Sequence, residues 1–247
     1  LKILRLMNIA FEDEKFAGKL FSSCPVLEKL CLIDCWLPED FVVDSFPLLH
    51  DADLYYSYGD IESRFHPLSK FIMKLCNAMV LKMSGACFKI LKLAKVLSTS
   101  LPIFNNLIRL EVYNIRYLQM ETLLNFLEFC PNLESLVIRK VELSGKANEN
   151  TLTFNKVPRC LECLKSIEIQ KFNGSPKELE MVKFVLKHAR ILQTVIMETS
   201  YTVENYKDPG KKNLKAKEVE ALNKKILMQL GMSPWASAGC LIKFSSS

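Results

Sequence analysis

The chain has 247 residues, of which 49% are hydrophobic and 24% charged, and its formal net charge is +6. This much apolar material supports a large folded core and excludes an intrinsically disordered chain. The densest basic run lacks the aromatic side chains that usually stack on nucleic-acid bases, so we expect a solvated helix face and no nucleic-acid partner. That run comprises Lys211, Lys212, Lys215 and Lys217.

The nine cysteines show no disulfide-framework spacing and lie in apolar segments. We therefore expect reduced, buried thiols in an intracellular protein of the cytoplasm and/or nucleus. No secretory signal and no uncharged apolar run of bilayer-spanning length is visible, so we expect no membrane partner. The chain begins at Leu1 inside a strand-like pattern, which we interpret as the N-terminal truncation of a longer protein.

A triplet of the form Leu-x-x-Leu-x-Leu, with conservative apolar swaps, recurs from the first residue onward. Eight copies begin at positions 1, 27, 49, 78, 107, 133, 164 and 192, in uneven steps of 26, 22, 29, 29, 26, 31 and 28 residues. The last two apolar positions are two residues apart, so in a strand they face the same side. The pattern predicts an α/β leucine-rich-repeat solenoid, with a curved parallel sheet on the concave side and helices on the convex side.

Each repeat is expected to contain a helix, a turn and a strand, and three helices can be located from their apolar spacing. Residues 16–21, 121–129 and 179–186 carry apolar side chains at helical spacing. Near the end of the chain, Val219, Leu222, Ile226 and Leu230 form one face of a helix. Residues 240–244 follow as a final short strand, and residues 205–212 form a polar turn. We expect the C-terminal helix and strand to cap the solenoid, because a last repeat otherwise exposes its core face.

The turns before two strands resemble a family signature. Residues 24–30 (CPVLEKL) and 130–136 (CPNLESL) are similar to the CPxLExL motif of plant F-box leucine-rich-repeat proteins. Residues 157–170 (VPRCLECLKSIEIQ) resemble the opening of the FBD domain that closes many of those proteins, and residues 233–244 resemble its terminal strand. The resemblance divides the chain into leucine-rich repeats over residues 1–154 and an FBD-like region over residues 155–247.

This resemblance implies the substrate-recognition part of an F-box subunit of a cullin-RING ubiquitin ligase. In such a subunit the repeats hold a target protein, and an F-box docks the ligase adaptor and cullin. The 247 residues contain no F-box, so the docking function is expected in a missing N-terminal part. The alternative is a free-standing repeat scaffold without a ligase role.

The sequence shows few patterns typical of catalytic or metal-binding sites. We therefore expect that the protein is not an enzyme and binds no metal and no cofactor. The phosphate-binding and zinc-protease motifs are absent, and the histidines (His50, His66 and His188) lie far apart in the chain. Cys160 and Cys163 form a lone C-x-x-C without a second ligand pair, and a strand follows them at once. A bound small molecule is neither supported nor excluded.

The residues that alternate with the buried ladder positions are expected on the concave surface of the sheet. Aromatic and arginine side chains are enriched among the residues that dominate protein interfaces. The expected protein-binding set combines such residues with charged neighbours: Asp53, Tyr55, Lys82, Arg109, Glu111, Tyr113 and Arg139.

Overall fold

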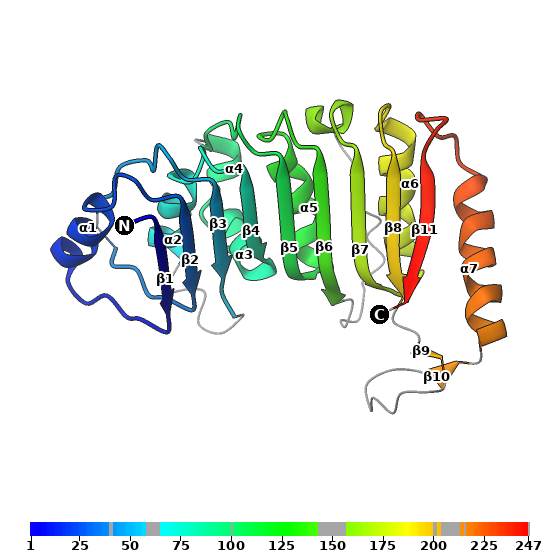
Figure 1. Cartoon of the computed structure of the whole chain (residues 1–247), viewed down its shortest axis with the longest axis horizontal. Helices are drawn as coiled ribbons and strands as arrows, with labels where there is room; N and C mark the ends of the chain where they lie inside the picture. The colour runs from blue at the N-terminus through cyan, green and yellow to red at the C-terminus, as the bar shows by residue number, and fades with distance from the viewer. Residues whose placement is uncertain are drawn as a thin grey trace.

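Within the described residues, nine parallel strands lie side by side in one sheet along the length of the molecule (Figure 1). The computed structural model describes residues 1–39, 42–57, 65–99, 101–142, 157–199, 202–203, 213–214 and 216–246. In spatial order the strands are β1 (Ile3–Met7), β2 (Lys29–Ile33), β3 (Asp51–Tyr55), β4 (Val80–Ser84), β5 (Arg109–Arg116), β6 (Ser135–Glu142), β7 (Ser166–Phe172), β8 (Thr194–Thr199) and β11 (Leu241–Ser246). Two short strands, β9 (Thr202–Val203) and β10 (Asn213–Leu214), pair separately.

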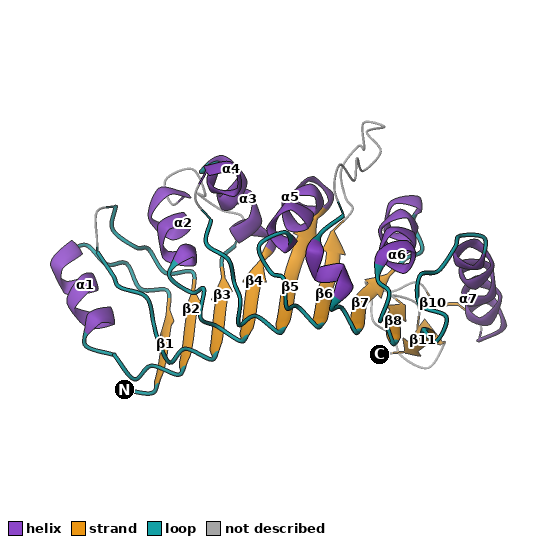
Figure 2. Ribbon diagram, turned by 90° about the horizontal axis from the view of Figure 1, so that it is seen from above, coloured by secondary structure: helices purple, strands orange, loops and turns teal. Residues whose placement is uncertain are grey.

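The helices lie on one side of this sheet, and the strands line the inner side of a shallow arch (Figure 2). They are α1 (Glu14–Ser22), α2 (Phe65–Met73), α3 (Gly85–Leu93), α4 (Val96–Thr99), α5 (Tyr117–Leu127), the 3-10 helix η1 (Arg159–Glu162), α6 (Pro176–His188) and α7 (Ala216–Gly231). The prediction of a leucine-rich-repeat solenoid is therefore confirmed. None of the helices in the described residues is long and apolar enough to cross a bilayer.

The helical predictions for residues 16–21, 121–129 and 179–186 are confirmed, although α5 begins four residues earlier than its pattern. Helices α2 and α3 agree with the expectation of a helix in each repeat, although their positions were not predicted. The shortest repeat step, 22 residues, is explained by the absence of a helix from the described residues between β2 and β3, namely 34–39 and 42–50.

The apolar ladder explains why these segments become strands. In every copy from the second onward the three ladder side chains are buried at 3% exposure or less. The first copy departs from this pattern, because Leu1 is 63% exposed rather than turned into the core. A further ladder lies three residues before each triplet from the second onward, and only its two cysteines were expected to be buried. Its members share complete or nearly complete burial: Cys24, Phe46, Leu75, Phe104, Cys130, Leu161 and Ala189.

Backbone hydrogen bonds join the repeats where each strand begins. The carbonyl oxygen of His50 accepts from the N–H groups of Met79 and Val80, at 3.0 and 2.8 Å. The same two-donor arrangement recurs between each consecutive pair of strands from β1 to β8. The accepting carbonyls belong to Lys2, Glu28, His50, Met79, Ile108, Glu134 and Lys165. These contacts fix the strand register without using any side chain.

Left-handed backbone occurs in four repeats at one position, two residues after the last ladder residue: just after β1 and β2, and inside β5 and β7. The φ angles are 54° at Asn8, 47° at Asp34, 49° at Asn114 and 55° at Lys171. Asparagine and aspartate tolerate this conformation better than other side chains, because their short polar groups bond locally. Three of the four positions therefore hold a suited residue, and Lys171 is the exception.

The C-terminal segment extends the same architecture. Helix α7 packs beside α6, and its residues Ile226 and Leu230 are buried. Gly174, at φ +68°, lets α7 approach, since a Cβ there would lie 3.1 Å from Ile226 Cδ1. The predicted helix and final strand are confirmed, and β11 pairs in parallel with β8. The predicted turn over residues 205–212 lies outside the described residues, as do Lys211, Lys212 and Lys215.

Replacing Lys171 with asparagine should stabilise the fold by about 0.5–1 kcal/mol, because asparagine relieves the left-handed strain of an exposed lysine. The measurement is the urea unfolding midpoint of the Lys171→Asn variant against the parent chain. Lys171→Val is the matched comparison, since a β-branched side chain is least tolerant of positive φ and should lower the midpoint. Equal midpoints for both variants would contradict the strain argument.

Candidate protein-binding face

All seven predicted binding residues lie together on four adjacent strands, β3 to β6. Asp53 is in register with Lys82, and Lys82 with Glu111. Tyr113 is in register with Arg139 on the next strand. The sheet thus gathers residues up to 86 positions apart in the chain into one patch, here called the β3–β6 patch: Asp53, Tyr55, Lys82, Arg109, Glu111, Tyr113 and Arg139.

Glu111 is the centre of this patch and is only 6% exposed. Its Oε1 accepts from Arg109 Nε at 2.9 Å, and its Oε2 accepts from Arg139 Nε at 3.0 Å. Arg109 also donates from Nη1 to the hydroxyl of Ser135 at 3.2 Å. The arginine side chains remain 35–37% exposed. Each is therefore held by Glu111 and still accessible to solvent.

Two tyrosines extend the network toward the strand ends. The Tyr113 hydroxyl lies 3.3 Å from Glu111 Oε2, and the Arg139 guanidinium carbon lies 5.9 Å from the centre of the Tyr113 ring. The Tyr55 and Tyr113 rings meet edge to face at 6.4 Å. Asn114 donates from its amide to the Tyr55 hydroxyl at 3.0 Å. The left-handed residue Asn114, inside β5, therefore also positions a side chain of the patch.

The β3 side of the patch is acidic. Lys82 lies 3.7 Å from Asp51, and both side chains are partly exposed. Asp53 Oδ1 is buried and has no hydrogen-bond partner among the described residues. Burial raises the pKa of Asp53, and Asp51 and Glu111 add to the effect, whereas Lys82 opposes it.

The charge of Glu111 is set by two opposing effects. Burial by itself would raise its pKa, but the hydrogen bonds and positive charges of Arg109 and Arg139 outweigh burial and lower the pKa from its usual value. Burial, with Asp53 and Glu111 nearby, raises the pKa of Tyr113 to about 12. At neutral pH the patch therefore holds an ionised Glu111 and a neutral Tyr113 hydroxyl.

Two other positions expected on the concave surface are not available there. Val137 is 1% exposed, and Ser84 is 1% exposed. The Ser84 hydroxyl accepts from the Tyr56 backbone N–H at 3.0 Å and donates to the Tyr56 carbonyl at 2.9 Å, so it binds the backbone that follows β3 in the preceding repeat. Strict alternation fails at Ser84 because the chain enters a helix at the next residue.

The histidine and cysteine side chains considered as catalytic or metal-binding candidates include residues bonded or buried within the fold. A ring nitrogen of His188 lies 2.8 Å from the Phe184 carbonyl within α6. Burial raises the pKa of the Cys160 thiol to about 12, so this cysteine is a protonated core residue at neutral pH. Within the described part of the chain, no group of three or more histidine, cysteine, aspartate or glutamate side chains could hold a metal ion.

Comparison with known proteins gives two family matches. Residues 155–197 match the FBD family model, and residues 1–25 match a leucine-rich-repeat model. The resemblance to plant F-box/FBD/LRR-repeat proteins, inferred from the turn motifs and residues 157–170, is confirmed by these matches and by relatives of that kind. No solved structure gives a significant match.

Three Arabidopsis thaliana proteins illustrate the likeness. An FBD-associated F-box protein is 29% identical over 194 residues, covering 78% of this chain and 38% of that relative. A putative FBD-associated F-box protein is 25% identical over 289 residues, covering 99% and 63%. An F-box/FBD/LRR-repeat protein is 25% identical over 256 residues, covering 78% and 56%. The matched parts thus span between 38% and 63% of the length of these relatives.

Neutralising Glu111 should destabilise the fold at neutral pH and have little effect in acid. The folded pKa is lowered, so its stabilising effect is present at neutral pH and is lost as the pH falls through that folded value. Glu111→Gln should cost about 1.5–3 kcal/mol at pH 7, the usual value of hydrogen bonds to charged groups. Urea unfolding at pH 7 and at an acidic pH below the folded-state pKa of Glu111 measures the difference between variant and parent.

Glu121→Gln is the control for this experiment, because Glu121 is an exposed carboxylate paired with Lys92 at 3.9 Å on the helical side. Its effect should be close to zero at both pH values, as for most surface pairs. A Glu111→Gln penalty that stayed the same at both pH values would contradict the role assigned to the ionised carboxylate.

Proposed function

We propose that this chain holds a target protein on the β3–β6 patch and is the substrate-recognition part of an F-box subunit of a cullin-RING ubiquitin ligase. The observation that carries the binding half of the proposal is the Arg109–Glu111–Arg139 network. The ligase half rests on the relatives, whose names combine F-box, FBD and leucine-rich repeats.

The patch has the physical properties of a protein-binding surface. Tyrosine and arginine are the side chains most often responsible for binding energy at interfaces. Here the two arginines are held by Glu111, and the Tyr55 and Tyr113 rings contact each other. Side chains already ordered in the free protein lose less conformational entropy when a partner binds. The patch is therefore preorganised for a target with complementary polar groups.

We also propose that the two parts of the chain have different roles. Residues 1–154 would supply the repeats that carry the β3–β6 patch, and residues 155–247 would continue and cap the solenoid as an FBD-like region. The capping role is supported by α7, whose Ile226 and Leu230 are buried beside α6, and by β11, which extends the sheet beyond β8.

In this proposal the chain itself is a binding protein, not an enzyme, and acts in the cytoplasm and/or nucleus. The ligase adaptor and cullin would bind through an F-box outside residues 1–247. The alternative, a scaffold without a ligase role, shares the binding face and differs only in that second connection.

The test is affinity purification of the full-length protein with quantitative mass spectrometry. The parent should retain ligase adaptor, cullin and a target. The double variant Lys82→Gln/Arg139→Gln should keep adaptor and cullin but lose roughly tenfold or more of the target, because two contact groups are removed. Unfolding midpoints should accompany the measurement, since Arg139 also bonds to Glu111.

Lys92→Gln supplies the matched control on the helical side, where the lysine side chain is 60% exposed. It should capture the target like the parent. Purification of a target without adaptor or cullin would favour the scaffold alternative. Equal target capture by the double variant would remove the β3–β6 patch as the binding face.

A further inference from the structure

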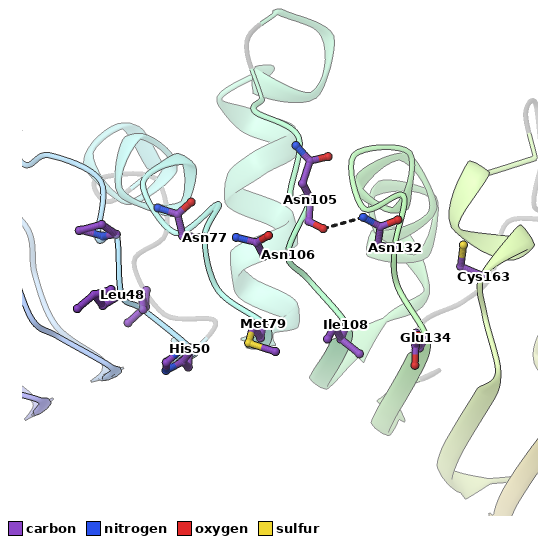
Figure 3. Close-up of a pocket in the computed structure, with 12 residues that line it drawn as sticks. Leu48, His50, Asn77, Met79, Asn105, Asn106, Ile108, Asn132, Glu134 and Cys163 are labelled. Carbon is purple, nitrogen blue, oxygen red and sulfur yellow. Dashed lines mark hydrogen bonds between the residues drawn. The ribbon is translucent and has the colours of Figure 1, made fainter.

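A surface hollow lies outside the β3–β6 patch, along the edge where the strands begin (Figure 3). It has a volume of about 600 Å³ and crosses five consecutive repeats, from the turn before β3 to the turn before β7. We call it the strand-start groove. Its described lining is Pro47, Leu48, Leu49, His50, Asn77, Met79, Asn105, Asn106, Ile108, Asn132, Glu134 and Cys163.

The groove runs between two rows of side chains, as Figure 3 shows. Each first ladder residue points into the core, so the residues just before and just after it point outward. The row after the ladder residue contains Met79 and Ile108, which are 39% and 38% exposed. Leu48, 48% exposed, lies at one end of the other row. The groove thus presents an apolar strip that no described segment covers.

Carboxamides dominate the other row. Asn77 donates to the Phe46 carbonyl at 3.2 Å, and Asn132 donates to the Asn105 carbonyl at 2.8 Å (Figure 3). These two bonds hold both amides in place and leave their oxygens as acceptors. In the part of the chain that the structure describes, the Asn105 and Asn106 amides have no hydrogen-bond partner. Carboxamides both donate and accept, as the peptide groups of an extended chain do.

The charge of the groove narrows the choice of ligand. Its described lining contains no lysine or arginine, and its carboxylate, Glu134, is paired with Lys165 at 2.7 Å. A phosphate-bearing ligand or an acidic peptide would find no lysine or arginine in this lining, and the Lys165 ammonium beside it is already paired with Glu134. Recognition of such groups depends on lysine and arginine. A basic ligand would find a carboxylate that is already neutralised. The complementary ligand is uncharged.

We propose that the strand-start groove binds an extended, uncharged polypeptide segment whose apolar side chains rest on Met79 and Ile108 and whose backbone bonds to the asparagine amides. Four steps of about 4.8 Å between five strands give roughly 19 Å, which is about six residues at 3.3 Å each. The site is separate from the β3–β6 patch, and the inference holds whether or not the protein belongs to a ligase.

The experiment is selection of a random heptapeptide phage library on the purified 247-residue chain. Enriched peptides are then synthesised with a fluorescent label, and their dissociation constants are measured by polarisation. Neutral peptides with apolar residues at alternate positions should be enriched. Affinity should change less than about twofold between 50 and 500 mM NaCl, because salt screens only charged contacts.

Groove variants provide the decisive comparison. Met79→Thr/Ile108→Thr should weaken binding by roughly tenfold or more, since it removes the apolar contact area. Asn106→Ala should weaken binding by about 3- to 10-fold, the value of one hydrogen bond. Asn106 is exposed, so this variant tests the groove even if the double variant is destabilised. Lys82→Gln on the β3–β6 patch is the control and should bind like the parent.

Three outcomes would overturn the inference. Enrichment of no sequence would show that the groove holds no peptide. Enrichment of acidic or basic peptides, with steep salt dependence, would indicate a different chemistry. Peptides that lose affinity with Lys82→Gln but not with Asn106→Ala would bind at the β3–β6 patch instead.

Discussion

The fold depends on one constraint: a single repeat cannot bury its own apolar side chains. Each strand presents two inward residues, and each turn presents two more, at positions such as Cys130 and Leu133. Only the neighbouring repeats can cover them, so the strands must stack in parallel and in register. Burial at 3% exposure or less in every triplet after the first shows how completely this is achieved.

The stacking also determines what the concave side can do. Side chains at one ladder-flanking position from successive repeats stand next to one another, whatever their distance along the chain. Glu111 is consequently flanked by Lys82 of one neighbouring strand and lies within hydrogen-bond distance of Arg139 on the other. A carboxylate this buried needs charged partners, and Arg109 and Arg139 provide them. The surface is therefore ordered by its own charges before any partner arrives.

Most of the architecture could be predicted because the repeat is strong and its period is local. The ladder positions, three helices, the C-terminal helix and the last strand all follow from apolar spacing. The same alternation located the concave residues. The alternation could not predict which side chains bond to one another. The Glu111 contacts with Arg109 on the same strand and with Arg139 on the next depend on side-chain rotamers, which the sequence does not reveal.

The failures have physical causes as well. Helix α3 begins directly after β4, with Gly85 following Ser84, so no polar loop separates the two elements in the sequence. Leu1 matches the triplet, yet it is exposed, since a pattern does not reveal whether a neighbour covers it. The strand-start groove was not anticipated, because its residues lie in turns whose outward side chains share no period of hydrophobicity.

The two-donor carbonyls at the strand starts have a consequence for how such proteins change over evolutionary time. Consecutive repeats are held together by backbone hydrogen bonds to the carbonyl oxygens of His50, Met79, Ile108 and Glu134. The side chains at these positions do not take part in those backbone bonds, and they differ in charge, size and polarity. Substitutions there can be accumulated with little loss of stability, so recognition along this edge can diverge between related proteins while the scaffold beneath it is inherited unchanged.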